Sequence, residues 1–253
     1  MSRITQQLNQ KRAYVAYLTA GDGGIQHSLH SILALITGGV DIIEIGIPFS
    51  DPVADGLVIQ QASFRALQAG TTIKNIFNLV SELRKRTQIP IVLFSYYNPI
   101  FKYGPTFYQD AEQAGVDGCL MVDLPLEESA EHLKLCKKHQ IDPIFLISPS
   151  TSEARIKIIS EHGRGMLYYV CRNGTTGVKS SLPENFAENM RRIKQNTNLP
   201  IVTGFGISNK EMAGQAIKYA DGFVVGSLFV ETTARIKDYA ELTRLAKSLD
   251  PRS

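Results

Sequence analysis

The chain has 253 residues, of which 43% are hydrophobic and 20% are charged, and its formal net charge is +3. This length can bury a substantial core without disulfides or structural metals, and a mild positive charge spread along the chain argues against a nucleic-acid-binding protein. The cysteines form neither a zinc pattern nor a redox pair, the N-terminus lacks the apolar core of a signal peptide, and no apolar run approaches the ~18 residues of a membrane span. We therefore expect a cytoplasmic protein without a metal site.

Short apolar segments alternate with amphipathic segments along the whole chain. The apolar segments predict eight strands, at Ala13–Leu18, Ile42–Gly46, Ile89–Ser95, Gly118–Val122, Asp142–Ile147, Met166–Val170, Ile201–Thr203 and Gly222–Val225. The amphipathic segments predict helices at Ser28–Thr37, Asn75–Arg86, Phe107–Ala114, Ser129–His139, Glu153–His162, Glu184–Asn196, Lys210–Tyr219 and Ile236–Leu249. One extra helix fits before the first strand and another between the second and third strands. The five histidines fall on helical or turn segments and are expected at the surface.

Strands that alternate with helices imply a parallel sheet with right-handed crossovers. Eight such units in a chain of this length match an α/β fold, the closed (β/α)8 barrel of the TIM type with extra helices. We expect residues 1–253 to form one domain of this kind. An open doubly wound sheet is the alternative, but it is weakened because no GxGxxG motif follows the first strand.

The second predicted strand carries one carboxylate in an otherwise apolar segment. Glu44 lies among isoleucines, where a buried charge is costly unless it has a partner or a function. Prolines and a glycine then interrupt regular structure and place Asp51 and Asp55 on a loop. In a barrel, the C-terminal ends of the strands and the loops after them form the active site, so Glu44 and Asp55 are candidates for proton transfer. A structural role for Glu44 and a turn-capping role for the aspartates are the alternatives.

Two glycine-rich turns follow the seventh and eighth predicted strands. Gly206, Gly226 and Ser227 are the candidate phosphate-binding residues, because glycine lets backbone N–H groups approach an anion closely. This pair of loops commonly binds phosphate in barrels, although a plain helix cap is the alternative for Ser227. The loop of residues 171–181 has the small and polar residues that are typical of a substrate lid, and its Gly177 is a further candidate for phosphate binding.

The segment EIGIPFSDPVADG, residues 44–56, resembles the signature of the tryptophan synthase α subunit family. Further segments resemble that family in the same order: YYNPI at 96–100, DLP at 123–125, Arg172, Gly174, Thr176 and Gly177 in the lid, and GFGIS at 204–208. The resemblance covers nearly the whole chain. It implies a lyase of tryptophan biosynthesis that cleaves indole-3-glycerol phosphate into indole and glyceraldehyde 3-phosphate by a retro-aldol reaction. It also implies no cofactor in this chain, and an α2β2 complex with a β subunit whose pyridoxal phosphate joins the indole to serine.

The resemblance assigns roles to individual residues. Glu44 is the general acid that protonates the indole ring carbon and then the base that removes the side-chain hydroxyl proton. Asp55 stabilises the positive charge that develops at the indole N–H. The substrate-binding candidates are Tyr168 and Thr176, together with Phe205, Tyr96 and Ile59, which would help form the wall of the apolar indole pocket.

Two loops differ from the common pattern of this family. The lid carries Cys171, Asn173 and Thr175, and Leu57 stands where a proline is frequent. Because lid closure excludes water and completes a site, these differences leave a second hypothesis open, an α-like subunit that mainly binds and activates the β subunit. A different phosphosugar barrel enzyme is a third hypothesis. The signature disfavours it, because such enzymes of the same pathway place their acids and a required lysine elsewhere.

Overall fold

A computed structural model describes residues 2–171, 181–204 and 206–252 of the chain. Its eight parallel strands form a closed barrel in chain order, because β8 pairs with β1 and completes the ring. The strands are β1 (Ala13–Thr19), β2 (Ile42–Gly46), β3 (Ile91–Ser95), β4 (Gly118–Met121), β5 (Asp142–Ile147), β6 (Leu167–Val170), β7 (Ile201–Gly204) and β8 (Gly222–Val225). The prediction of a (β/α)8 TIM barrel is therefore confirmed, and the open doubly wound alternative is wrong.

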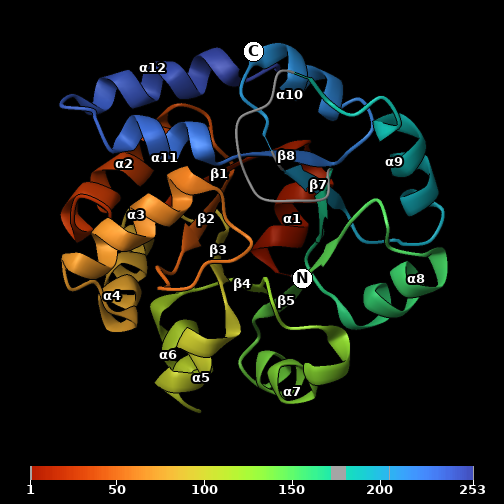
Figure 1. Cartoon of the computed structure of the whole chain (residues 1–253), viewed down its shortest axis with the longest axis horizontal. Coiled ribbons are helices and arrows are strands. Elements are labelled where there is room, and N and C mark those ends of the chain that lie inside the picture. The colour runs from red at the N-terminus through yellow and green to blue at the C-terminus, as the bar shows by residue number, and fades with distance from the viewer. Residues whose placement is uncertain (1, 172–180, 205, 253) are drawn as a thin grey trace.

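Helices surround this ring of strands (Figure 1). They are α1 (Arg3–Gln10), α2 (Ile25–Thr37), α3 (Leu57–Gln68), α4 (Ile73–Arg84), α5 (Tyr97–Tyr103), α6 (Phe107–Ala114), α7 (Ala130–Lys138), α8 (Glu153–His162), α9 (Phe186–Lys194), α10 (Lys210–Ala216), α11 (Ser227–Thr233) and α12 (Tyr239–Leu249). Several begin at a residue that caps them: the Thr72 hydroxyl accepts from the backbone N–H of Asn75 at the start of α4, for example. A 3-10 turn at Leu126–Glu128 precedes α7.

The predicted strands are all present, and their ends differ from prediction only slightly. β3 begins at Ile91 rather than Ile89, because Pro90 has no N–H to donate to a neighbouring strand. Two helices were not predicted. One is α5, whose Pro99 lies in the first turn, where a proline is tolerated. Only Gly226 separates α11 from β8, so the sequence shows no visible loop between them.

The position of β2 directs Glu44 into the barrel. Glu44 is in register with Tyr17 on β1 and with Val92 on β3, and register neighbours point to the same face of a sheet. Ile43 and Ile45 alternate with Glu44 and point to the opposite face, toward the helices. All five residues of β2 are buried, so the strand holds a carboxyl group inside the molecule.

The N-terminal ends of the strands are closed by α1 and by aspartates. Ile4 of α1 packs against Gly118 and Gly165, near the starts of β4 and β6. Three aspartates that precede even-numbered strands accept a backbone hydrogen bond from the start of the preceding strand. These pairs are Asp41 with Tyr14 N (2.8 Å), Asp117 with Ile91 N (2.8 Å) and Asp221 with Ile201 N (2.9 Å). This end of the barrel is therefore organised for stability, and the opposite end is left for a site.

Two of the histidines lie inside the protein, so the prediction that all five are at the surface is wrong. His132 and His139 are buried. The Nδ1 atom of His132 lies 2.7 Å from the Tyr108 hydroxyl, and burial lowers the pKa of His132 to about 4. A polar partner inside the protein makes a buried imidazole acceptable, and the helical pattern alone did not reveal that partner.

Within the described ranges, no helix combines the length and the apolar character that a membrane span requires. The same residues contain no group of three or more histidine, cysteine or acidic side chains arranged to hold a metal ion.

Candidate active site

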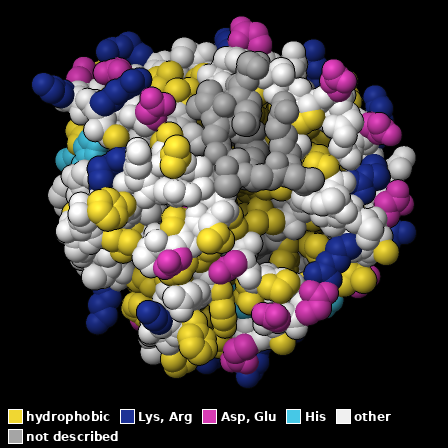
Figure 2. All heavy atoms as spheres, viewed as in Figure 1, with side chains coloured by type: hydrophobic (Ala, Val, Ile, Leu, Met, Phe, Trp, Pro, Cys, Tyr) yellow, Lys and Arg dark blue, Asp and Glu magenta, His cyan; other side chains and the backbone are white. Residues whose placement is uncertain are grey.

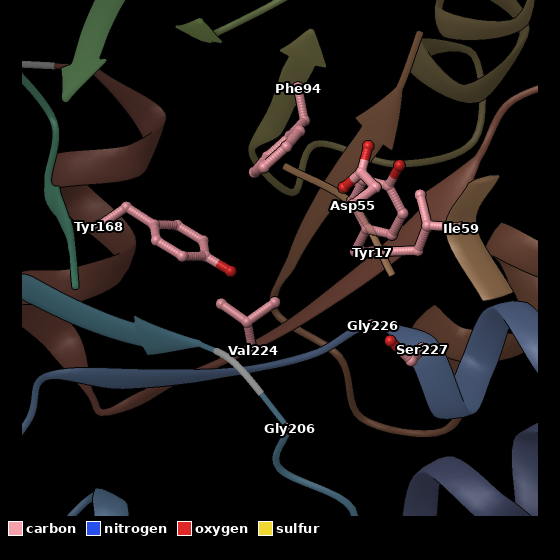
Figure 3. Close-up of a pocket in the computed structure, with 9 residues that line it drawn as sticks. All are labelled: Tyr17, Asp55, Ile59, Phe94, Tyr168, Gly206, Val224, Gly226 and Ser227. Atoms are coloured by element: carbon pink, nitrogen blue, oxygen red, sulfur yellow. The ribbon is translucent and has the colours of Figure 1, made fainter. Parts of the chain in front are cut away.

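A cavity of about 40 Å³ lies at the C-terminal ends of the strands (Figure 3). It is lined by Tyr17, Asp55, Ile59, Phe94, Tyr168, Gly206, Val224, Gly226 and Ser227. This volume holds only a few water molecules.

Most of the predicted site residues are found at this cavity. Six of them line it: Asp55, Ile59, Tyr168, Gly206, Gly226 and Ser227. Glu44 and Tyr96 are buried beside it without lining it, whereas Phe205, Thr176 and Gly177 lie outside the described residues. Of the unusual lid residues, Asn173 and Thr175 also lie outside, and Cys171 is buried with its Sγ donating to the Gly204 carbonyl at 2.7 Å.

Glu44 is a fully buried acid. Its side chain has no exposed surface, and within the described part of the chain neither carboxyl oxygen has a hydrogen-bond partner. Burial raises the pKa of Glu44 to about 8, because the ionised form loses its hydration. Glu44 is therefore mainly protonated at pH 7 and can donate a proton. Its structural alternative required a backbone or tyrosine donor, and the described residues supply none.

Asp55 reaches the cavity from the loop between β2 and α3. Its Oδ2 accepts a hydrogen bond from the Tyr96 hydroxyl at 3.1 Å, and its carbonyl oxygen accepts one from Gln60 Nε2 at 2.7 Å. Burial raises the pKa of Asp55 to about 6, and the Tyr96 hydrogen bond acts in the opposite direction. Asp55 is therefore mainly ionised at pH 7 while Glu44 is mainly protonated. Environments that separate two carboxyl groups in this way are typical of acid–base sites.

Two tyrosines contribute neutral hydroxyl groups to the cavity. Figure 3 shows Tyr168 of β6 pointing toward the cavity centre. A Cβ atom on Gly204 would lie 2.1 Å from the Tyr168 hydroxyl oxygen, and one on Gly46 would lie 2.1 Å from that of Tyr17. Glycine at these two positions thus makes room for the phenol groups. Burial, together with the nearby Glu44, raises the pKa of Tyr168 well above its usual value, so it remains a hydrogen-bond donor.

Gly206, Gly226 and Ser227 form the side of the cavity next to β7 and β8. Gly206 has a φ of +93°, a backbone conformation that glycine adopts without the strain of a side chain. The three residues therefore bring backbone groups and one hydroxyl to the same cavity as Asp55.

The sequence interpretation missed Tyr17, Phe94 and Val224, which line the cavity from β1, β3 and β8. The signal that identifies such residues is the period-two alternation of a strand: the last inward-facing positions face the mouth of a barrel. Tyr96 was predicted as part of the apolar pocket wall. Its ring is not in the cavity lining, and its hydroxyl contacts Asp55 instead.

Comparisons with known proteins agree with this geometry. A family model described as tryptophan synthase alpha chain matches residues 4–249. The tryptophan synthase alpha chain of Coxiella burnetii (strain CbuK_Q154) is 60% identical, over 99% of this chain and 98% of its own length. That of Chlamydia felis is 44% identical over the full length of both chains. Among solved structures, tryptophan synthase subunit alpha from Legionella pneumophila str. Paris superposes with a TM-score of 0.89 at 38% identity, covering 98% of this chain and 97% of that one.

Proposed function

The chain belongs to the tryptophan synthase alpha chain family, whose members are lyases, and on that premise we propose that it cleaves indole-3-glycerol phosphate into indole and glyceraldehyde 3-phosphate. The observation that carries the proposal is the pair of carboxyl groups with opposite protonation states. Glu44, with a pKa of about 8, has a proton to donate, and Asp55, with a pKa of about 6, is available as an anion.

In the proposed reaction Glu44 first donates a proton and then removes one, and Asp55 acts as an anion. Protonated Glu44 donates its proton to the indole ring carbon that bears the glycerol chain. The indole nitrogen becomes positively charged, and the Asp55 carboxylate accepts a hydrogen bond from its N–H and stabilises that charge. Glu44, now ionised, removes the proton of the adjacent side-chain hydroxyl. The carbon–carbon bond breaks, its electrons return to the indole ring, and the hydroxyl carbon becomes the aldehyde.

The remaining predicted residues bind the substrate in this proposal. Tyr168, Ile59, Phe205 and Thr176 contact the indole and the glycerol chain, and Gly206, Gly226, Ser227 and Gly177 bind the phosphate. Glycine backbones and one hydroxyl on the Asp55 cavity support that assignment. The chain itself needs no cofactor for this reaction, because the proton transfers and the charge stabilisation use protein groups only.

We place a β subunit with pyridoxal phosphate over the same end of the barrel, in an α2β2 assembly. Support comes from apolar side chains that are exposed on the segments following β2 and β3: Val53, Leu57 and Phe101 are 79%, 73% and 71% exposed. Exposed apolar side chains that gather near a site are typical of protein interfaces. Figure 2 shows hydrophobic side chains around a hollow near the centre of the face in view.

The test is indole release from indole-3-glycerol phosphate, measured with the chain alone and with the β subunit. We expect Glu44→Gln to lower kcat by at least about 100-fold, because removal of a general acid costs on the order of 10² to 10⁴ in rate. Asp51→Asn is the matched control for Asp55→Asn, because Asp51 is an exposed acid on the same loop. Unchanged cleavage by Glu44→Gln would refute the assignment of that residue.

The alternative is an α-like subunit that mainly activates the β subunit. It is not favoured, because both candidate catalytic acids are in place and the relatives are named as alpha chains. The same assay separates the two: stimulated β activity without any indole release would establish the alternative and exclude the lyase.

A further inference from the structure

Tyr96 connects the segment after β3 to the loop that carries Asp55. Its hydroxyl accepts a hydrogen bond from the backbone N–H of Ala54 at 2.9 Å and donates one to Asp55 Oδ2 at 3.1 Å. Its ring lies 5.2 Å from the ring of Phe49, at the other end of the same loop. One side chain therefore contacts this loop at three places.

Tyr96 is itself held in place by its neighbours. It immediately precedes α5, and the Ser95 hydroxyl donates to its carbonyl oxygen at 2.8 Å. The next residue, Tyr97, donates its backbone N–H to Asp123 Oδ1 at 2.7 Å, which ties the start of α5 to the loop after β4. With a buried side chain and a fixed backbone, Tyr96 has little freedom to follow the Asp55 loop. The loop must therefore adjust to Tyr96.

The direction of the hydrogen bonds decides which form of Asp55 this arrangement favours. A phenol hydroxyl has one proton to donate. Because the Ala54 N–H already donates to the oxygen, that proton points to Asp55, which must accept it. An ionised carboxylate is a pure acceptor and a stronger one than the protonated form.

We propose that Tyr96 is a positioning residue of the site, whose hydroxyl holds the Asp55 carboxylate ionised and directed at the reacting centre. The inference rests on the proposed function, in which ionised Asp55 stabilises the charged indole nitrogen. In this role the Tyr96 side chain orients Asp55, whereas the family resemblance implied that it forms part of the pocket wall.

The other titratable groups around Asp55 do not replace this donor. Tyr17 on β1 and Tyr168 on β6 line the same cavity, and Glu44 is in register with Tyr17. Burial raises the pKa of Tyr17, Tyr96 and Tyr168, and the negative charge of Asp55 adds to this effect because it repels their ionised forms. Among the residues that the structure describes, Tyr96 is the one side chain that donates to the Asp55 carboxylate, and Gln60 donates to the Asp55 backbone carbonyl instead.

The experiment compares Tyr96→Phe with the wild-type chain in the indole-release assay from pH 5 to pH 9. Phenylalanine keeps the ring against Phe49 and removes only the hydroxyl. Loss of one hydrogen bond to an ionised carboxylate raises its pKa by about 1 unit. We expect kcat/KM of the variant to fall roughly tenfold below wild type at pH 5 and to return to within about twofold above pH 8.

Tyr103→Phe is the matched control, because the Tyr103 hydroxyl also donates to an aspartate, Asp110 Oδ2, at 2.6 Å. Neither residue of that pair lines the cavity, so the ratio of control to wild-type kcat/KM should not change with pH. A Tyr96→Phe ratio that is likewise independent of pH, with wild-type indole release intact, would overturn the inference and leave the proposed function standing.

A second measurement does not depend on activity. In wild-type protein labelled with ¹³C at the tyrosine Cζ, the Tyr96 resonance should titrate with a midpoint near the Asp55 pKa of about 6. This titration should disappear in Asp55→Asn. A Tyr96 resonance that does not respond to Asp55 ionisation would refute the inference even if the chain released no indole, an outcome that would separately refute the proposed function.

Discussion

The two carboxyl groups of the site differ because different kinds of element carry them. Glu44 is held on a fully buried strand, where the backbone cannot move it toward a donor. Asp55 lies on a loop, and its carboxylate accepts a hydrogen bond from the Tyr96 hydroxyl. Burial on a strand therefore keeps Glu44 protonated. The loop position and the Tyr96 hydroxyl keep Asp55 ionised.

These states predict a bell-shaped pH dependence for kcat/KM of indole release. Activity requires ionised Asp55, so it falls as the pH drops through about 6, and it requires protonated Glu44, so it falls as the pH rises through about 8. The limbs are properties of the interacting pair rather than of isolated residues. Circular dichroism over the same pH range is the control that separates titration from unfolding. A rate that stays constant from pH 5 to pH 9 would contradict this mechanism.

At the level of single residues, the sequence predicts the acids better than their surroundings. Glu44 is conspicuous because a charge among isoleucines has few structural explanations, and the resemblance of residues 44–56 to the family signature points to Asp55. The Tyr96 hydrogen bond is not visible there, because it joins residues 41 positions apart in the chain. Tyr17 is in register with Glu44 only through strand pairing, which the sequence does not display.

The connection between neighbouring strands depends on aspartates that stand just before β2, β4 and β8. Each satisfies a backbone N–H at the start of the preceding strand, where no ladder partner is available. Asp117 differs from the other two in that its pair with Arg84 is the most buried of their ion pairs. It accepts from Ile91 N at 2.8 Å and from Arg3 Nη1 at 2.8 Å, and it pairs with the largely buried Arg84.

Asp117→Ala should therefore lower the free energy of unfolding by about 3–5 kcal/mol, because it leaves the Ile91 N–H without its acceptor and the largely buried Arg84 guanidinium without its carboxylate. Urea denaturation followed by circular dichroism measures the change. Glu131→Ala is the control, since Glu131 is exposed and forms an ion pair with Lys134 at 3.3 Å, and exposed pairs contribute about 0–1 kcal/mol. A loss below about 1 kcal/mol for Asp117→Ala would show that other residues at this end of the barrel satisfy the Ile91 N–H and the Arg84 guanidinium.

The elements themselves were predictable where a single physical signal dominates. Strands buried on both faces give continuous apolar runs, and β2, β5 and β8 have the predicted bounds. The pattern fails where two signals compete or none exists. The helix α5 contains a proline, Pro99, and α11 follows β8 after the single residue Gly226, so neither helix was predicted. The burial of His132 was missed because its polar partner, Tyr108, is distant in the sequence.

As a whole, the molecule separates stability from chemistry along the barrel axis. Ion pairs and aspartate caps gather at the N-terminal ends of the strands, where α1 packs. The cavity and the exposed apolar side chains lie beyond the C-terminal ends. A barrel that keeps its closing contacts at one end can tolerate at the other an acid such as Glu44, which has no hydrogen-bond partner among the described residues.

Arg252 lies at the end of the barrel opposite the cavity, so its substitution tests this separation. It pairs with Asp41 and with Asp250, and it donates to the carbonyl oxygens of Arg12 at 2.7 Å and Gly39 at 3.1 Å. It thereby fastens the end of the chain to the segments that enter β1 and β2.

Arg252→Ala should lower the free energy of unfolding by at least about 2 kcal/mol, because one charged hydrogen bond contributes about 1.5–3 kcal/mol and Arg252 makes several, although Lys11 remains to pair with Asp41. If residues 1–253 form one domain, the variant should still unfold in one urea transition, at a lower midpoint. Its indole release at 25 °C should stay within about twofold of wild type, because the cavity lies at the other end of the barrel. The exposed Arg244 on α12 provides the control Arg244→Ala, which should change stability by no more than about 0.5 kcal/mol. Two separate transitions would contradict the single domain, and a loss of activity at full stability would contradict the separation of the two ends.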